Sequence, residues 1–255
     1  MARIALTRMV SRALGRCELT HLARREINVD LARTQHAAYA DALRDAGCDV
    51  LQLPEKPDLA DSVFVEDTVI MLEQVAVLTR PGAASRRAEI ESMAIALAPF
   101  REVRRIAAPA TLDGGDVLRL DRVLHVGASA RSNADGMKQL ALLVAPFAYR
   151  VQTVPLHGCL HLKSAVTQIA ANLLLFNPDW VDARHFPGYH TVAVDPSEPF
   201  AANSLLVGNR LLYSAAFPRT AEVLRRAGVH VDSLDMSETE KAEGGVTCCS
   251  VIFDA

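Results

Sequence analysis

The sequence predicts a mixed α/β fold, a five-bladed α/β propeller whose ββαβ repeats close into a ring. Three observations predict it. Short β-rich apolar runs alternate with amphipathic helical segments along the chain. Short polar or acidic signatures recur about every 40 to 50 residues, a repeat length typical of propellers and solenoids. The last signature is followed by only one strand, so the other elements of that repeat must come from the N-terminus.

Each repeat starts with its signature and continues through two strands, a turn, a helix and a third strand. Residues 4–6, the helix that starts at residue 30 and the strand 50–53 complete the last repeat. The N-terminus then lies beside the C-terminus, no sheet edge stays free, and equivalent strand ends meet at one central channel. The five signatures are FVED (64–67), GGDV (114–117), HLKS (161–164), AANS (201–204) and GVTC (245–248).

Four segments have the periodicity of amphipathic helices. They span residues 30–45, 85–97, 133–144 and 219–227. A glycine directly follows the last of them, and another lies two residues beyond the first, as is common at helix C-termini. The alternative to a ring is an open mixed α/β sheet in which the likeness of the segments is coincidental. The apolar face of the first helix is formed by Leu31, Ala38, Tyr39, Ala42 and Leu43.

Length and composition predict one globular domain over residues 1–255. Half of the residues are hydrophobic and 22% are charged, and no apolar run is long enough to cross a bilayer. The formal net charge of −3 provides no basic field for a phosphate backbone, so neither nucleic acid nor a membrane is expected as a partner. Arginines interrupt the apolar start of the chain, which disfavours a signal peptide and favours a cytoplasmic protein.

The cysteines and histidines show no pattern of a metal site. Five cysteines form an odd set without a CxxC pair, and a chain of this length needs no disulfide to fold, so we expect reduced thiols. His185 and His190 lack the cysteines or the helical context that a zinc site requires. We therefore expect neither a metal nor an organic cofactor.

A thiol and an imidazole are the first candidates for catalysis. Cys248 follows Gly244 and Gly245, which permit a close backbone approach just before a strand that would carry the thiol. His161 starts the third signature, and a cysteine with a distant histidine is the minimum set for thiol catalysis with acid–base help. A buried cysteine is more commonly inert, so the pair alone is weak support.

Acidic residues at matching positions sharpen this interpretation. Glu66 and Asp67 are expected at the end of an apolar strand, and Asp113 precedes the double glycine of the next repeat. They could form internal salt bridges, but three acids around one thiol and one imidazole instead suggest a cationic, planar guanidinium substrate. Arg86 and Arg131 start equivalent helices; they are either solvated or placed to bind a substrate carboxylate.

These residues and their flanking motifs resemble the dimethylarginine dimethylaminohydrolase (dimethylargininase) family, within the guanidine-modifying enzymes known as penteins. The resemblance extends over nearly the whole chain. It implies a pentein-like five-bladed propeller that hydrolyses asymmetric dimethylarginine to citrulline and dimethylamine, and monomethylarginine to citrulline and methylamine. The matching motifs are DSVFVEDT, TRPGAASRR, ATLDGGDV, ARSN, LHLKS, AAN and GGVTCCSV.

The resemblance also implies roles for individual residues. Cys248 would be the nucleophile, forming a thiouronium intermediate, and His161 the general acid and base, while Asp113 is an aspartate where some bacterial relatives have glutamate. The small-molecule partner would be a methylated arginine. Its guanidinium would bind Asp113, Glu66 and Asp67, its α-carboxylate Arg86 and Arg131, and its α-amine Asp61; Phe64, Leu19, Ala242 and Glu243 would form the lid and walls.

Two other functions fit part of the pattern. An arginine or agmatine deiminase shares the thiol, the imidazole and the paired acids, but arginine deiminases commonly carry an extra helical insertion for which this chain has no room. A catalytically silent propeller that binds a macromolecule would lack the pair of Cys248 and His161. A homodimer is conceivable, although no dimer patch can be recognised in the sequence.

Overall fold

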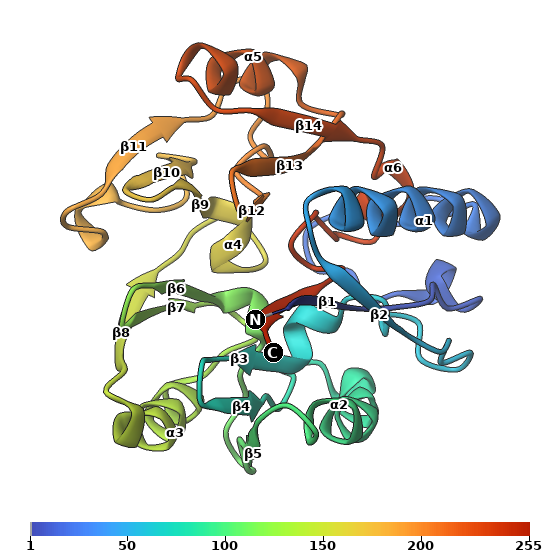
Figure 1. Cartoon of the computed structure of the whole chain (residues 1–255), viewed down its shortest axis with the longest axis vertical. Coiled ribbons are helices and arrows are strands. Elements are labelled where there is room, and N and C mark those ends of the chain that lie inside the picture. Colours follow the sequence, from blue (N-terminus) through green and yellow to red (C-terminus); the bar gives the residue numbers. More distant parts are fainter. Residues whose placement is uncertain (1) are drawn as a thin grey trace.

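Residues 2–255, which the computed structural model describes, form five three-stranded sheets. In each sheet the central strand is antiparallel to one neighbour and parallel to the other. Figure 1 shows the sheets around a common centre, with the longer helices outside them. In chain order the sheets are β3 (Val69–Met71), β4 (Val75–Leu78) and β5 (Glu102–Arg105); β6 (Val117–Leu120), β7 (Val123–Ala128) and β8 (Arg150–Pro155); β9 (Val166–Ala170), β10 (Leu173–Phe176) and β11 (His190–Ala193); and β12 (Ser204–Val207), β13 (Arg210–Ser214) and β14 (Val231–Leu234).

The fifth sheet joins the two ends of the chain. β1 (Arg3–Arg8) lies between β15 (Val251–Asp254) and β2 (Asp49–Leu53), antiparallel to the former and parallel to the latter. The termini are therefore adjacent (Figure 1). Contacts of β3 with β15 and of β14 with the helix α1 (Val29–Asp45) link this sheet to its neighbours on both sides. The predicted ring closure is confirmed, and the open-sheet alternative is wrong.

The helix α1 shows why the sequence forms this element and where periodicity misplaces its buried face. The side chain of Asn28 accepts a hydrogen bond from the Leu31 N–H, which caps the first turn, and Gly47 follows the helix in the left-handed region at φ +88°. Tyr39 and Leu43 are buried as predicted, whereas Leu31 and Ala38 are exposed. The buried face is rotated because it includes the polar Gln35 and His36, which an apolar pattern does not count.

The other outer helices also depart from their predicted forms. Residues 85–89 belong to a 3-10 helix, η3 (Ala84–Glu89), and the α-helix α2 starts only at Ile90 and ends at Leu97. A 3-10 turn aligns side chains three residues apart, which brings Arg86 over Glu89. α3 (Ala134–Val144) and α5 (Pro218–Arg226) lie where they were predicted, within one residue at each end.

The third unit lacks the expected α-helix. Between β10 and β11 the chain forms only one 3-10 turn, η6 (Ala183–His185). Two prolines and a glycine in this segment, Pro178, Pro187 and Gly188, leave too short a run for an α-helix. The rule of one helix per repeat is therefore wrong for this unit, although its three strands match the others.

Buried apolar side chains between neighbouring sheets hold the units together. One cluster contains Leu6 of β1, Leu78 of β4, Met93 of α2 and Phe253 of β15, and so joins both ends of the chain to the first unit. This core fixes the signatures at the inner ends of the sheets relative to one another.

Within residues 2–255, no helix is both long and apolar enough to span a membrane.

The signatures form short turns rather than strand ends. FVED lies in η2 (Val65–Thr68), GGDV enters η4 (Gly114–Asp116), and HLKS enters α4 (Leu162–Ala165). The turns η2 and α4 both contact η4. Glu66 and Asp67 therefore precede β3 instead of ending a strand, and Cys248 lies in a turn before β15 instead of on a strand. A tight turn exposes a side chain and its backbone N–H groups to the same small volume, which suits a binding site.

Ring closure also depends on one buried hydroxyl. Tyr39 on α1 is fully buried, and its hydroxyl donates to the Val246 carbonyl at 2.7 Å and is bonded to Ser250 Oγ at 2.7 Å. Tyr39→Phe should lower the free energy of unfolding by about 1–3 kcal/mol, because a buried carbonyl loses its partner. Chemical denaturation measures this. Tyr189→Phe is the control, since its hydroxyl bonds to Asp121 in an exposed position; equal effects of the two variants would contradict the assignment.

Candidate active site

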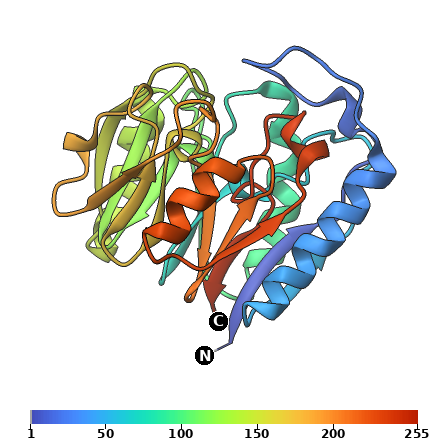
Figure 2. The same ribbon diagram turned by 90° about the horizontal axis from the view of Figure 1, so that it is seen from above.

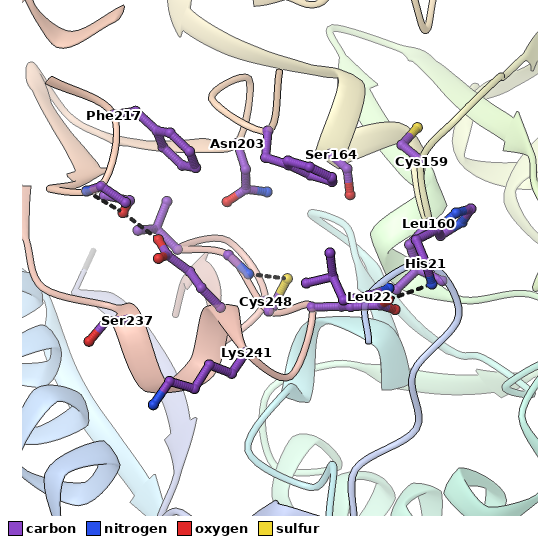
Figure 3. Close-up of a pocket in the computed structure, with 18 of the residues that line it drawn as sticks. His21, Leu22, Cys159, Leu160, Ser164, Asn203, Phe217, Ser237, Lys241 and Cys248 are labelled. Carbon is purple, nitrogen blue, oxygen red and sulfur yellow. Dashed lines mark hydrogen bonds between the residues drawn. The ribbon is translucent and has the colours of Figure 1, made fainter. Parts of the chain in front are cut away.

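Cys248 is the cysteine whose thiol faces open space. It is half-buried, whereas Cys249 is fully buried within an apolar cluster and directs its thiol at the Gly245 carbonyl. The Gly245 N–H donates to the sulfur of Cys248 at 3.3 Å, and the Cys248 N–H donates to the Gly245 carbonyl at 3.2 Å. The four-residue turn therefore fixes where the thiol points, as Figure 3 shows.

The double glycine before this turn is required by close packing. A Cβ at Gly244 would lie 2.2 Å from the ring of Phe64, and one at Gly245 would lie 2.3 Å from the side-chain oxygen of Asn203. No side chain fits at either distance. The predicted close backbone approach is confirmed, with Phe64 and Asn203 as the groups approached.

His161 is buried between two carboxylates. Its Nε2 lies 3.1 Å from Asp113 Oδ2, and its Nδ1 lies 3.8 Å from Asp67 Oδ1. Gly115 makes room for the ring, because a Cβ there would lie 2.6 Å from Nδ1. Burial alone would lower the pKa of His161, but the charge of Asp67 and the hydrogen bond with Asp113 outweigh it and raise the pKa to about 9. His161 is therefore protonated at neutral pH.

The alternative of an internal salt bridge is realised for Asp67. Arg86 is 4% exposed and donates to Asp67 at 2.5 Å, to both oxygens of Glu89, and to the carbonyls of Asp61 and Phe64. Burial would raise the pKa of Asp67, but the charges of His161 and Arg86 lower it to about 2. The possibility that Arg86 is solvated is wrong, because the 3-10 turn directs it into the site. The side-chain atoms of Asp67, Asp113 and His161 that could bind a metal ion lie within 4.8 Å of one another. The ion pairs among these residues explain this spacing.

Glu66 forms a different pair. Its two oxygens accept hydrogen bonds from the Lys163 ammonium at 2.5 Å and from the Thr247 hydroxyl at 2.7 Å. Thr247 also bonds to Asn203, and the Glu66 N–H donates to the Cys248 carbonyl. Glu66 thus adjoins the turn that carries the thiol.

A buried acid that the sequence did not single out lies behind the histidine. Asp116 accepts hydrogen bonds from Ser132 and from the Leu162 N–H, and also bonds to Ser129. Burial raises the pKa of Asp116 to about 6. Its bond to the first residue of α4 holds the segment that carries His161. The sequence signal for Asp116 is its place as the second acid of the DGGD run, of which only the first acid, Asp113, was predicted as a site residue.

Three residues contact the loop 18–22, which Figure 2 places at the end of the ring opposite the termini: Asp61, predicted for the α-amine, Arg131, predicted for the α-carboxylate, and Glu243, predicted for the lid and walls. Asp61 accepts from the Glu18 N–H, and Arg131 donates to the Thr20 hydroxyl at 2.8 Å. Glu243 accepts from the N–H groups of residues 20–22 and has a left-handed backbone at φ +60°. Non-glycine residues rarely adopt this conformation, which Asp121 and Ala148 share in this chain.

Two cavities meet at Cys248. The smaller one contains most of the predicted residues, and Leu19 packs partly buried against the cluster that includes Phe64 and Ala242. The larger cavity is mainly apolar, and Figure 3 shows Cys248 there with Leu22, Ser164 and Asn203 around it. The smaller cavity is the one that brings the thiol of Cys248 and the imidazole of His161 together. Its lining residues are Glu18, Asp61, Phe64, Asp67, Arg86, Arg131, Leu160, His161, Ala242, Glu243, Gly244 and Cys248.

The charge on His161 can be tested directly. Asp113→Asn removes the anion bonded to Nε2, so the pKa of His161 should fall from about 9 by roughly one unit or more. NMR of the imidazole measures this titration. In the wild type, a pKa raised above the usual 6.5 contributes stability that is complete below about pH 6.5 and lost as the pH rises through about 9.

The control for this titration is an acid outside the site. Asp182→Asn removes an acid that is paired with Arg184 on a surface turn, and it should leave the titration of His161 unchanged. A histidine that titrates near 6.5 in the wild type would contradict the assignment.

Comparisons with known proteins agree with this geometry. The family model described as N,N dimethylarginine dimethylhydrolase, eukaryotic, matches residues 19–184. The N(G),N(G)-dimethylarginine dimethylaminohydrolase of Streptomyces coelicolor is 41% identical over 249 residues, which cover 97% of this chain and 95% of that protein. The enzyme of the same name from Pseudomonas aeruginosa is 36% identical over 224 residues, covering 87% and 88%.

A solved structure extends the likeness to the fold. A cysteine-to-serine variant of the Pseudomonas aeruginosa enzyme, complexed with citrulline, superposes with a TM-score of 0.94 at 34% identity and covers 99% of this chain and 100% of that one. On the family model and on two relatives that are more than 30% identical over most of their length, the chain belongs to the dimethylarginine dimethylaminohydrolase family.

Proposed function

We propose that the protein hydrolyses Nω,Nω-dimethylarginine to citrulline and dimethylamine, and monomethylarginine to citrulline and methylamine. The observation that carries this proposal is that the half-buried thiol of Cys248 and the imidazole of His161, flanked by the carboxylates of Asp67 and Asp113, line one cavity. Two relatives are named for this reaction, and a related structure contains citrulline.

The cavity offers a complementary group for each end of the substrate. Asp67, which lines the cavity, would receive the guanidinium, as planar cations pair well with carboxylates, and Asp113 and Glu66, which do not line it, would support the cation through their charge. Asp61 would bind the α-amine. Arg131 would bind the α-carboxylate together with Arg86. Among residues 2–255, Nη1 of Arg86 donates one of its two N–H groups to Asp67, and the second would donate to the substrate.

The neighbouring groups complete the pocket. Phe64 and Ala242 form apolar walls, and Leu19 on the loop 18–22 covers the substrate. Glu243 holds that loop through three backbone N–H groups, so its effect on binding would be exerted through the lid.

The first half of the reaction depends on charge. Burial, then the charges of Glu66 and Asp67, raise the pKa of Cys248 to about 12, so the resting thiol is protonated. A bound guanidinium supplies positive charge beside the sulfur and lowers that pKa. Because His161 is already protonated, the thiol releases its proton to solvent. The thiolate adds to the guanidinium carbon, the carbon–nitrogen bond breaks as His161 donates its proton to the departing dimethylamine, and a cationic thiouronium stays on the sulfur.

The second half reverses the role of the histidine. His161, now neutral, accepts a proton from a water molecule that adds to the thiouronium carbon. The new adduct collapses, the carbon–sulfur bond breaks, and citrulline leaves with the oxygen of that water. The carboxylates Asp67 and Asp113 stabilise both the cationic intermediate and the histidine when it is protonated.

Two rival functions use the same architecture. An arginine or agmatine deiminase would release ammonia from an unmethylated guanidine; membership of the dimethylarginine hydrolase family favours the methylated substrate. A silent propeller that binds a macromolecule would not need a half-buried thiol in an acidic cavity, so the geometry around Cys248 disfavours it.

Product analysis separates the three functions. The pure protein is incubated with dimethylarginine, monomethylarginine, arginine and agmatine, and citrulline, methylamines and ammonia are measured. We expect citrulline and dimethylamine in equal amounts from dimethylarginine, with a kcat/KM at least about tenfold above that for arginine. A preference for arginine or agmatine would indicate a deiminase, and no turnover of any of them would contradict an enzymatic role.

Adjacent cysteines provide a matched pair of variants for this assay. Cys248→Ser should abolish citrulline formation, because a serine hydroxyl at this site is a much weaker nucleophile. Cys249→Ser should keep most of the activity, since that thiol points into the core. The reverse result would move the nucleophile to Cys249.

Other expectations about the protein's setting stay predictions. They are a cytoplasmic location, one domain over residues 1–255, and a homodimer as the possible assembly. Light scattering on the purified protein would test the last of these, with a mass near the 27.6 kDa of one chain contradicting it.

A further inference from the structure

Two polar residues of the signatures have no role in the proposed reaction. Lys163 belongs to the HLKS signature and Asn203 to the AANS signature, and neither lines the smaller cavity. Both lie behind the turn that carries Cys248, and Asn203 is visible beside that turn in Figure 3. Their hydrogen bonds link four of the five units of the ring, those of the FVED, HLKS, AANS and GVTC signatures.

Asn203 holds the turn from one side through both ends of its amide. Its oxygen accepts from the Thr247 N–H at 3.1 Å, and its nitrogen donates to the Thr247 hydroxyl and to the Lys163 carbonyl, each at 3.0 Å. The contact is tight, because even a Cβ on Gly245 would collide with the amide oxygen. The residue before the nucleophile is thus fixed in both its backbone and its side chain.

Lys163 closes the same network from the other side. Its ammonium donates to Glu66 Oε1 at 2.5 Å, and the Thr247 hydroxyl donates to Glu66 Oε2 at 2.7 Å. The side chains of Lys163 and Glu66 are 16% and 12% exposed, so solvent screens this ion pair little. Glu66 in turn donates its N–H to the Cys248 carbonyl.

We propose that Lys163 and Asn203 are positioning residues, which hold Glu66 and the Gly245–Cys248 turn in one hydrogen-bonded cluster and so fix the sulfur of Cys248 in the cavity it shares with His161. This inference rests on the proposed function. Lys163 also neutralises the carboxylate nearest to the turn. Without it, the charge of Glu66 would oppose ionisation of the thiol more strongly, although Glu66 could then attract the guanidinium at least as well.

Lys163→Met tests the inference, because methionine keeps the length of the side chain and removes its charge. We expect kcat for dimethylarginine to fall about tenfold or more, the effect of losing a charged hydrogen bond, while KM does not rise. Alkylation of Cys248 by iodoacetamide at pH 8 should slow by a similar factor, and this rate can be measured without substrate. A thermal melt shows whether the variant is folded.

Controls separate positioning from stability and from substrate binding. Lys138→Met changes an exposed lysine on α3 and should leave kcat and the alkylation rate unchanged. Thr247→Val removes the hydroxyl between Glu66 and Asn203 and should behave like Lys163→Met, whereas Thr247→Ser should restore at least about half of the wild-type kcat; this pair replaces Lys163→Met if that variant does not fold.

Two results would overturn the inference. The first is a raised KM with unchanged kcat, which would make Lys163 a substrate-binding residue. The second is unchanged kcat and unchanged alkylation in both Lys163→Met and Thr247→Val. If the wild type does not hydrolyse dimethylarginine, the proposed function fails, but the alkylation rates still decide whether the cluster positions the sulfur.

Discussion

Charge compensation in a largely buried acidic cluster is the constraint on which the rest of the site depends. A carboxylate removed from water must pair with a cation or accept several hydrogen bonds. Around Cys248 each acid has such partners: Asp67 pairs with Arg86, Glu66 with Lys163, and Asp113 with His161. These pairs fix the side chains. The charge of Asp67 and the hydrogen bond with Asp113 keep the histidine protonated, and burial, then the charges of Glu66 and Asp67, keep the thiol neutral. A cation is then the ligand that this cluster accepts most readily.

The ring supplies this cluster from several units at once. Glu66 and Asp67 come from the turn before β3, Asp113 precedes η4, His161 precedes α4, and Cys248 precedes β15. Since each of these segments enters its sheet from the same end, no single unit needs to carry the whole site. The cost is that the last unit must be completed by the N-terminal strand and helix, which is why Tyr39 on α1 reaches the turn next to the nucleophile.

Much of this was predictable from the sequence because it depends on repetition. The five signatures, the strand completed by the N-terminus and the pairing of Cys248 with His161 follow from equivalent positions in the repeats. Side-chain partners were not predictable in the same way. The sequence left undecided whether Arg86 is solvated or lies in the site. The structure buries Arg86 because a 3-10 turn aligns it with Glu89, and helical periodicity does not predict a 3-10 turn.

The hydrogen-bond partners of Glu66 and of the second acid, Asp116, were not predicted for a related reason. Which acid meets which cation depends on distances between units, and the spacing of residues along one chain does not contain those distances. The missing helix of the third unit was predictable, since the prolines and the glycine of that segment are visible in the sequence.

The most direct test of this account is the ionisation of Cys248 with and without a bound cation. Thiolate absorbance at 240 nm, taken as the wild type minus Cys248→Ser, is followed against pH in the presence of saturating L-lysine or of L-norleucine, which has the same carbon chain but no side-chain ammonium. The account predicts that Cys248 forms no thiolate below pH 9 in the free protein or with norleucine. With lysine bound, it predicts that Cys248 ionises at a clearly lower pH than in the free protein. A thiolate already formed at pH 7 in the free protein, or equal effects of the two amino acids, would contradict it.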